Sequence, residues 1–459
     1  MLFGTYEFLF IFLPVTLIVY FLLAEKYFYY AKAWLIAASL FFYAYWNPIN
    51  VLIIISVSVV NFFLAKHLIK TRSRAVLTLG IVANLTVLGY YKYADFFIFN
   101  LNLLTGSNLS LLHIILPLGI SFFTFQKIAL LVDSYQGKVA KLSFSDFCLF
   151  ATFFPQLLAG PIVHHAEMMP QFANPQNRLI NWSNFSKGFF VFNMGLAKKL
   201  VIADSLSLIV ANGYLNAGAL DLKGAWITSL FYSLQLYYDF SGYSDMAIGL
   251  GLLFNIHLPL NFNSPYKAIN IQDFWRRWHM TLSRFLRDYI YIPLGGSKVS
   301  EFNTGKNLLI TFLIGGFWHG AGWTFIAWGA LHGIALNIHR IFSKTKLNIP
   351  TWLAIIITFL FVNITWVFFR AHSWENAMQL LTAMAGMGNT TGNFVLINDY
   401  YNLPIWIAAV ILLFGKNTNQ IADAFKPNLV FGIKLVLLIL LNLLFLNSSI
   451  SQEFLYFDF

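Results

Sequence analysis

The sequence predicts an all-α, polytopic integral membrane protein with about 10 to 12 transmembrane helices. Hydrophobic residues make up 59% of the 459 residues and charged residues only 10%, whereas soluble domains carry about 25% charged residues. The apolar runs are continuous rather than alternating, which favours helices over a membrane β-barrel. They follow one another with no long polar insert, so we expect a single membrane domain over residues 1–459.

Candidate spans are runs of roughly 20 mostly apolar residues. Several are short or broken by Pro or Gly, above all FFPQLLAGPIV (153–163). Such segments re-enter the membrane where protein buries them. The candidates are 8–24, 30–46, 49–65, 75–91, 113–132, 146–162, 186–211, 224–238, 243–258, 306–340, 352–370, 404–415 and 428–447.

Basic residues orient these spans. The cluster KHLIKTRSR (66–74) predicts a cytoplasmic loop, and counting spans from it places both termini outside the cytoplasm. The net charge of +11 then reflects loop topology rather than a nucleic-acid partner. The N-terminal apolar run has no basic flank or cleavage site, so we expect a retained span.

Residues 269–298 carry the densest charge of the chain. On a helix, one stripe is apolar, and four arginines fall mostly away from it. This predicts an amphipathic cytoplasmic segment, either an interfacial anchor against lipid or a platform for a phosphorylated donor. His279 lies at the border of the two faces. The stripe is Phe274, Trp278, Leu282, Phe285 and Tyr289, and the arginines are Arg276, Arg277, Arg284 and Arg287.

GGFWHGAGW (315–323) places His319 inside a long apolar run. An ionisable residue there needs a partner or a function. One interpretation is a core histidine bonded to a neighbouring helix. The other is a general base, with glycines that leave room for substrate and with Trp318 and Trp323 as walls of a tunnel. His332 is a weaker candidate of the same kind.

Two further stretches carry polar groups beside apolar residues. DFSGYSDMAIG contains Asp239 and Ser241, which either pack between helices or line a central tunnel. The aromatic tail at 451–459 is either a membrane anchor or the carrier of Tyr456, whose phenol can hold an acyl group covalently.

Metal and cofactor motifs are not expected. Cys148 is the single cysteine, which excludes an intramolecular disulfide and any CxxC motif. The adjacent His164 and His165 have no acidic cluster beside them in the sequence. The chain contains no P-loop, HExxH or GxSxG.

Several stretches together resemble membrane-bound O-acyltransferases of the bacterial branch, which includes alginate and peptidoglycan O-acetylation proteins and the teichoic-acid D-alanylation protein. The block with RRWH followed by a later WHG is the most specific part. After Phe125-Gln126 the sequence KIALLVDSYQG departs from the family's Ser-Tyr pair. The resembling stretches are LPLGISFFTFQ (116–126), FFPQLLAGPIV (153–163), DFSGYSDMAIGLG (239–251), LNFNSPYKAINIQDFWRRWHMTLSRFLRDYIYIPLGG (260–296) and GGFWHGAGWTFIAWGALHG (315–333).

The resemblance implies a fold around a central tunnel, His319 as the catalytic histidine and His279 as the second signature histidine. It implies acetyl-CoA as a cytoplasmic donor substrate, with no bound cofactor. It also implies an extracytoplasmic acetyltransferase partner, of SGNH type or similar, and a polysaccharide acceptor such as alginate or peptidoglycan. The tail resembles tails proposed to accept the acyl group, which maps to Tyr456. The location implied is the bacterial inner membrane.

Three alternatives remain open from the sequence. The first is transfer of D-alanyl or another acyl group to polymers of the teichoic-acid type. The second is a transporter or channel, which the broken spans favour and the missing internal repeat disfavours. The third is a scaffold for polysaccharide export, which would not need His319.

Overall fold

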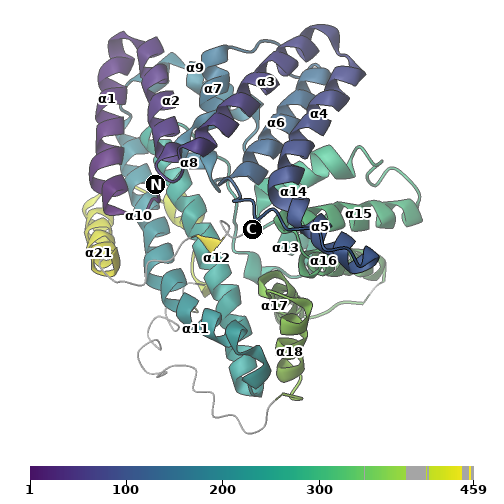
Figure 1. Cartoon of the computed structure of the whole chain (residues 1–459). Coiled ribbons are helices and arrows are strands. Elements are labelled where there is room, and N and C mark those ends of the chain that lie inside the picture. Colours follow the sequence, from purple (N-terminus) through teal and green to yellow (C-terminus); the bar gives the residue numbers. More distant parts are fainter. Residues whose placement is uncertain (346, 389–409, 411–412, 447–453, 456–459) are drawn as a thin grey trace. The chain divides into compact units, whose positions relative to one another are not determined.

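The computed structural model describes residues 1–345, 347–388, 410, 413–446 and 454–455. These residues form helices and connecting loops without a strand, which confirms the all-α prediction (Figure 1). They fall into two compact units. The first comprises residues 1–196, 243–259 and 425–435, and the second comprises 197–242, 260–424 and 436–459.

Five helical stretches among the described residues are long and apolar enough to cross a membrane. They confirm the membrane class, while the larger number of spans expected from the sequence stays a prediction. The stretches are Glu7–Lys26, Ile49–Thr71, Arg74–Thr105, Thr351–Arg370 and Leu429–Leu446.

The first unit is built mainly from the N-terminal helices. α12 (Leu222–Leu253) and α21 (Leu429–Leu446) contribute residues to both units. The other elements are η1 (Glu7–Phe12), α1 (Leu13–Lys26), α2 (Phe28–Ala44), α3 (Ile49–Thr71), α4 (Arg74–Leu88), η2 (Gly89–Tyr93), α5 (Ala94–Thr105), α6 (Ile120–Tyr135), α7 (Phe144–Thr152), α8 (Phe154–Leu157), α9 (His165–Ala173), η3 (Pro175–Arg178) and α10 (Trp182–Ala197).

Aromatic rings form the centre of this unit. Phe154, in the broken segment 153–163, packs against Phe12 and Phe42 with ring centroids 5.3 and 5.5 Å away. The whole broken segment is buried. A short helix of four residues thus sits inside protein, where its interrupted backbone is shielded from lipid.

Polar side chains join α3 to α4 within the same unit. Asn61 and Asn84 exchange two hydrogen bonds through their carboxamides, at 3.0 and 2.8 Å. Both side chains are buried, so the reciprocal pair satisfies groups that would otherwise be costly in an apolar interior.

The second unit contains the residues with candidate chemistry. Its elements besides α12 and α21 are η4 (Lys198–Ala203), α11 (Asp204–Leu215), η5 (Ala217–Ala219), η6 (Pro265–Lys267), α13 (Ile271–Trp275), α14 (Met280–Leu286), η7 (Arg287–Tyr291), α15 (Glu301–His319), α16 (Trp323–Phe342), α17 (Thr351–Arg370), α18 (Trp374–Met384) and α20 (Thr418–Asp423).

The apolar run at 306–340 is two helices rather than one span. α15 ends at His319, the backbone is extended at Gly320 and Gly322, and α16 begins at Trp323. The two helices pack along each other (Figure 1). The turn between them places His319 at a helix end, where the sequence pattern alone continues without interruption.

Glycine permits this close packing. A Cβ on Gly316 would collide with the carbonyl oxygen of Phe325 and lie 3.1 Å from the backbone of Gly329. A Cβ on Gly320 would collide with the Phe325 ring. The space beside these two glycines is therefore filled by α16, so they serve helix approach rather than the substrate space expected from the sequence.

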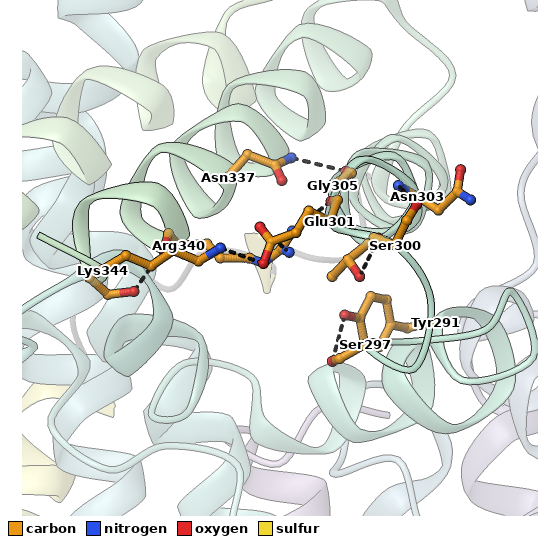
Figure 2. A network of polar contacts seen from close by, with 11 residues as sticks. Tyr291, Ser297, Ser300, Glu301, Asn303, Gly305, Asn337, Arg340 and Lys344 are labelled. Atoms are coloured by element: carbon orange, nitrogen blue, oxygen red, sulfur yellow. Dashed lines mark hydrogen bonds and ion pairs between the residues drawn. The ribbon is translucent and has the colours of Figure 1, made fainter.

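A polar network joins the start of α15 to the end of α16 (Figure 2). Glu301 at the start of α15 pairs with Arg340 at 2.9 Å and with Lys344. Asn337 donates a hydrogen bond to the backbone oxygen of Gly305 at 3.0 Å. These contacts fix the alignment of α15, which ends at His319, along α16.

Residues 269–298 do not form the continuous amphipathic helix on which the stripe of apolar residues was drawn. The helix stops after Trp275, turns through residues 276–279 and restarts at Met280. His279 has φ 42° and ψ 52°, in the left-handed region. The break arises from contacts with the preceding loop, which local periodicity does not reveal.

Candidate active site

The turn that carries His279 is held by the loop at 261–263. Met280 donates its N–H to the Asn261 carbonyl at 2.9 Å, and Asn263 donates to the Arg277 carbonyl at 2.9 Å. A left-handed conformation at a residue other than glycine costs about 1–3 kcal/mol and is kept only where surrounding contacts impose it. These two backbone bonds supply that support.

The side chain of Asn261 fixes the tautomer of His279. Asn261 Oδ1 accepts hydrogen bonds from Thr281, from its N–H at 3.4 Å and its hydroxyl at 2.9 Å. Because a backbone N–H only donates, the atom facing it is the carboxamide oxygen. His279 Nδ1, 3.0 Å from that oxygen, therefore carries the proton, and Nε2 carries the lone pair.

His279 has no exposed surface. Its ring meets Phe240 edge-on, with centroids 4.7 Å apart. Burial lowers the pKa of His279 to about 3, because the charged imidazolium loses its hydration. The imidazole is therefore neutral at pH 7, which is the form that can accept a proton.

His319 ends α15 within a cage of aromatic rings. Trp318, Trp328 and Phe369 have ring centroids 4.8, 5.1 and 5.0 Å from the His319 ring. Only 3% of His319 is exposed. The indole of Trp318 also approaches His279 at 6.3 Å, so one tryptophan contacts both candidate histidines.

The structure brings the two histidines together. The His279 and His319 rings lie 6.4 Å apart, centroid to centroid, although 40 positions separate them in the chain. Two imidazoles at this distance can address one reacting group between or beside them. These are the two residues selected from the sequence as catalytic candidates, and their catalytic role stays a prediction.

His332 is a structural histidine. Trp275 Nε1 donates to its Nδ1 at 3.2 Å, and its Nε2 lies 3.0 Å from the hydroxyl of Thr365, which itself donates to the Val362 carbonyl. His332 Nε2 therefore donates to Thr365. Both ring nitrogens are engaged and the side chain is fully buried, so His332 holds α13, α16 and α17 together.

Asp239 belongs to a buried charge cluster. Lys199 Nζ lies 2.8 Å from Asp239 Oδ1 and 2.7 Å from Asp204 Oδ1. Asp239 is followed by Phe240, the residue that packs on His279. Ser241, also buried, lies 3.5 Å from Lys198 Nζ. Sequence reasoning missed Lys199 and Asp204, since their link to Asp239 is visible only in three dimensions.

The four arginines differ in their surroundings. Arg277 pairs with Asp273 and Arg287 with Asp288, at 2.8 and 2.7 Å. Arg276 is exposed and Arg284 is half-buried. Arg287 is exposed as well, and the acidic partners of Arg277 and Arg287 reduce the local positive charge.

The remaining predicted residues differ in their exposure and in whether the structure describes them. Trp323 is 58% exposed at the start of α16, in contrast to buried Trp318. Tyr456 lies outside the described residues, but Phe454 and Leu455 just before it are described. Asn261 was not selected from the sequence; an asparagine within the quoted LNFNSPY stretch gave no signal of its contact with a histidine 18 positions later.

Within the described part of the chain, no three His, Cys, Asp or Glu side chains are grouped to hold a metal ion. Three apolar cavities of about 760, 440 and 560 Å³ are lined by other residues than His279 and His319. A passage leading to the histidines stays a prediction.

Comparison with known proteins supports one family. Residues 67–373 match MBOAT, the membrane-bound O-acyltransferase family. A Helicobacter pylori protein named "Peptidoglycan O-acetyltransferase" is 45% identical, in an alignment that covers 100% of this chain and 98% of the relative.

More distant relatives carry related names. A Pseudomonas aeruginosa protein named "Probable alginate O-acetylase AlgI" is 42% identical, covering 84% of this chain and 75% of the relative. A Streptococcus thermophilus protein named "Teichoic acid D-alanyltransferase" is 30% identical, covering 50% of this chain and 59% of the relative. With its apolar helices and its two neighbouring histidines, the chain belongs to the membrane-bound O-acyltransferase family and is an acyltransferase of the membrane.

Proposed function

We propose that this protein takes an acetyl group from a cytoplasmic thioester, acetyl-CoA, and passes it across the membrane for O-acetylation of a cell-envelope polysaccharide. The observation that carries the proposal is the pairing of His279 and His319 in one buried aromatic cluster. The likeness over the full chain to a peptidoglycan O-acetyltransferase favours that polymer, and the alginate relatives favour a related one.

His319 is the general base of the proposed reaction. An acceptor hydroxyl attacks the thioester carbonyl, and its proton passes to the His319 imidazole as the new C–O bond forms. The C–S bond breaks, and the departing CoA thiolate takes the proton. Such a base contributes about 10²–10⁴-fold, and alignment of the two substrates contributes the rest.

His279 and the arginines have supporting roles in this proposal. The hydrogen bond to Asn261 leaves Nε2 as the proton-accepting nitrogen of His279, whose ring lies 6.4 Å from that of His319. The exposed guanidinium groups of Arg276 and Arg287 bind donor phosphates, aided by Arg277 and Arg284, because a planar fork suits phosphate oxygens. Trp318, together with Trp323, Asp239 and Ser241, lines the acyl path.

Tyr456 is the proposed first acceptor. Its phenol receives the acetyl group and presents it outside the cytoplasm to a partner acetyltransferase, which places it on the polysaccharide. Both termini lie on that side of the inner membrane in this proposal. Only the acetyl group crosses, so neither CoA nor polymer needs a transport route.

Purified protein in detergent with acetyl-CoA labelled in the acetyl group tests the reaction. We expect release of free CoA and label on the C-terminal peptide. His319→Ala should abolish both while the protein remains in the membrane, and Tyr456→Phe should abolish the peptide label. An unlabelled wild-type protein that releases no CoA would contradict the proposal and favour a carrier or a scaffold.

Transfer of D-alanyl is the second candidate, supported by the teichoic-acid relative. It is disfavoured because that likeness covers only half of this chain, whereas the acetyltransferase likeness covers all of it. A D-alanyl thioester offered beside acetyl-CoA separates the two donors by which group appears on the protein.

A further inference from the structure

We infer that Asp239, clamped by Lys199 and Asp204, is a docking site for the chain's own C-terminal segment, which binds there as a peptide through its backbone. The docked residues are Phe454 and Leu455. The site requires no particular side chain at position 455, only its N–H. The consequence for acyl transfer to the next residue, Tyr456, rests on the proposed function.

The charge cluster orients the Asp239 carboxylate. Lys199 Nζ contacts Asp239 Oδ1 at 2.8 Å and Asp204 Oδ1 at 2.7 Å. The side chains of the three residues are 12%, 1% and 5% exposed for Lys199, Asp239 and Asp204. An ammonium held between two carboxylates fixes the plane of each one, since charge-assisted bonds are short and directional.

The second oxygen of Asp239 binds the tail. Leu455 donates its backbone N–H to Asp239 Oδ2 at 2.9 Å, across 216 positions of sequence. A buried carboxylate needs donors on its oxygens, because an unsatisfied charge in an apolar interior is costly. The tail therefore supplies one of the bonds on which the buried carboxylate depends.

Phe454 provides the apolar part of the contact. It is 3% exposed, and its ring lies 5.7 Å from that of Phe240. Phe240 in turn meets His279 edge-on at 4.7 Å. The ring of Phe240 therefore lies between Phe454 of the docked tail and His279.

This geometry gives the docking site its purpose. Residue 456 follows Leu455 directly, and two residues of chain span at most about 7 Å. Holding Leu455 limits how far the next residue of the chain can move, which in the proposed function raises the effective concentration of Tyr456 as an acceptor. Asp239 and Lys199 are positioning residues in this scheme.

Protection of the tail from proteolysis tests docking independently of chemistry. An endoproteinase that cleaves after glutamate cuts between Glu453 and Phe454 and releases the hexapeptide FLYFDF, which mass spectrometry quantifies. Cleavage after Glu301, whose side chain is 70% exposed, serves as the internal reference. The full-length protein in detergent is used throughout.

A matched pair of substitutions isolates the backbone bond. Leu455→Pro removes the N–H donor, whereas Leu455→Ala keeps it and shortens the side chain. We expect hexapeptide release to be about tenfold faster or more in Leu455→Pro, as for loss of a hydrogen bond to a charged group. Asp239→Ala and Lys199→Met should act in the same direction, and Leu455→Ala should resemble wild type.

The results separate docking from acceptor chemistry. Equal release from wild type and Leu455→Pro would overturn the docking site, whatever the other variants do. Faster release from Leu455→Pro and Leu455→Ala alike would also overturn it, since the side chain would then be the anchor. Intact protection without acetyl label on the wild-type tail would overturn only the acceptor role of Tyr456.

Discussion

His279 and His319 lie with their ring centroids 6.4 Å apart and share Trp318 as a neighbour of both. One comes from a turn in a broken amphipathic segment and the other from the end of α15. In the proposed reaction they act on the same reacting group, so their effects on rate should be coupled.

Coupling predicts strongly non-additive substitutions. His279→Ala and His319→Ala should each reduce acetyl transfer by about 10²-fold or more. The double variant should lose no more than the worse single variant, as for residues that act as a unit. His339→Ala, at a half-buried position near the end of α16, is the control and should keep full activity. Losses that multiply in the double variant would show two independent roles.

Asn261 should control the pH dependence through His279. Because burial lowers the pKa of His279 to about 3, this supporting imidazole stays neutral down to low pH in wild type. Asn261→Asp places a carboxylate about 3 Å from Nδ1, which stabilises the imidazolium and raises the pKa. The acid limb of the rate profile should therefore move to higher pH.

Asn261→Ala is the companion change, and it adds no charge. It removes the orienting bond, so transfer should fall by about tenfold or more without the same shift of the acid limb. Rates of CoA release measured between pH 4 and pH 8 compare the variants. Identical profiles for Asn261→Asp and wild type would contradict the positioning role.

His332 should affect stability rather than chemistry. His332→Ala leaves the buried Trp275 N–H without its acceptor, which costs about 1–3 kcal/mol, and removes packing as well. We expect a lower thermal midpoint in detergent and, at a temperature where the protein is folded, transfer within about tenfold of wild type. Loss of transfer with an unchanged midpoint would instead make His332 part of the reaction.

The general architecture could be predicted from the sequence because composition and continuous apolar runs follow from the membrane environment. His279 and His319 were selected as candidate catalytic residues because of the RRWH and WHG stretches, which resemble the family. What local patterns could not supply were contacts between distant positions. The helix break at His279 depends on Asn261 and Asn263, and the charge around Asp239 depends on Lys199, 40 positions earlier.

The glycines around His319 are a second case in which local sequence could not reveal a contact between distant positions. Small residues in an apolar run are compatible with both an open space and a close helix contact. Only the position of Phe325 and Gly329 on the returning helix decides between them, in favour of contact at Gly316. The sequence contains both glycines but not the turn that brings them together.

Close approach of α15 and α16 should therefore be necessary for the position of His319. Gly316→Ala would force its Cβ into the Phe325 carbonyl, and backbone cannot move aside as a flexible side chain does. We expect a lower thermal midpoint and a loss of transfer of about tenfold or more, because overpacking costs about 1–3 kcal/mol and displaces the helix end.

Gly322→Ala is the matched control: its Cβ would meet Phe325 at 3.5 Å, an ordinary contact, and its φ of −162° suits alanine. If Gly316→Ala behaves like Gly322→Ala in both measurements, the glycine does not set the spacing of the helices.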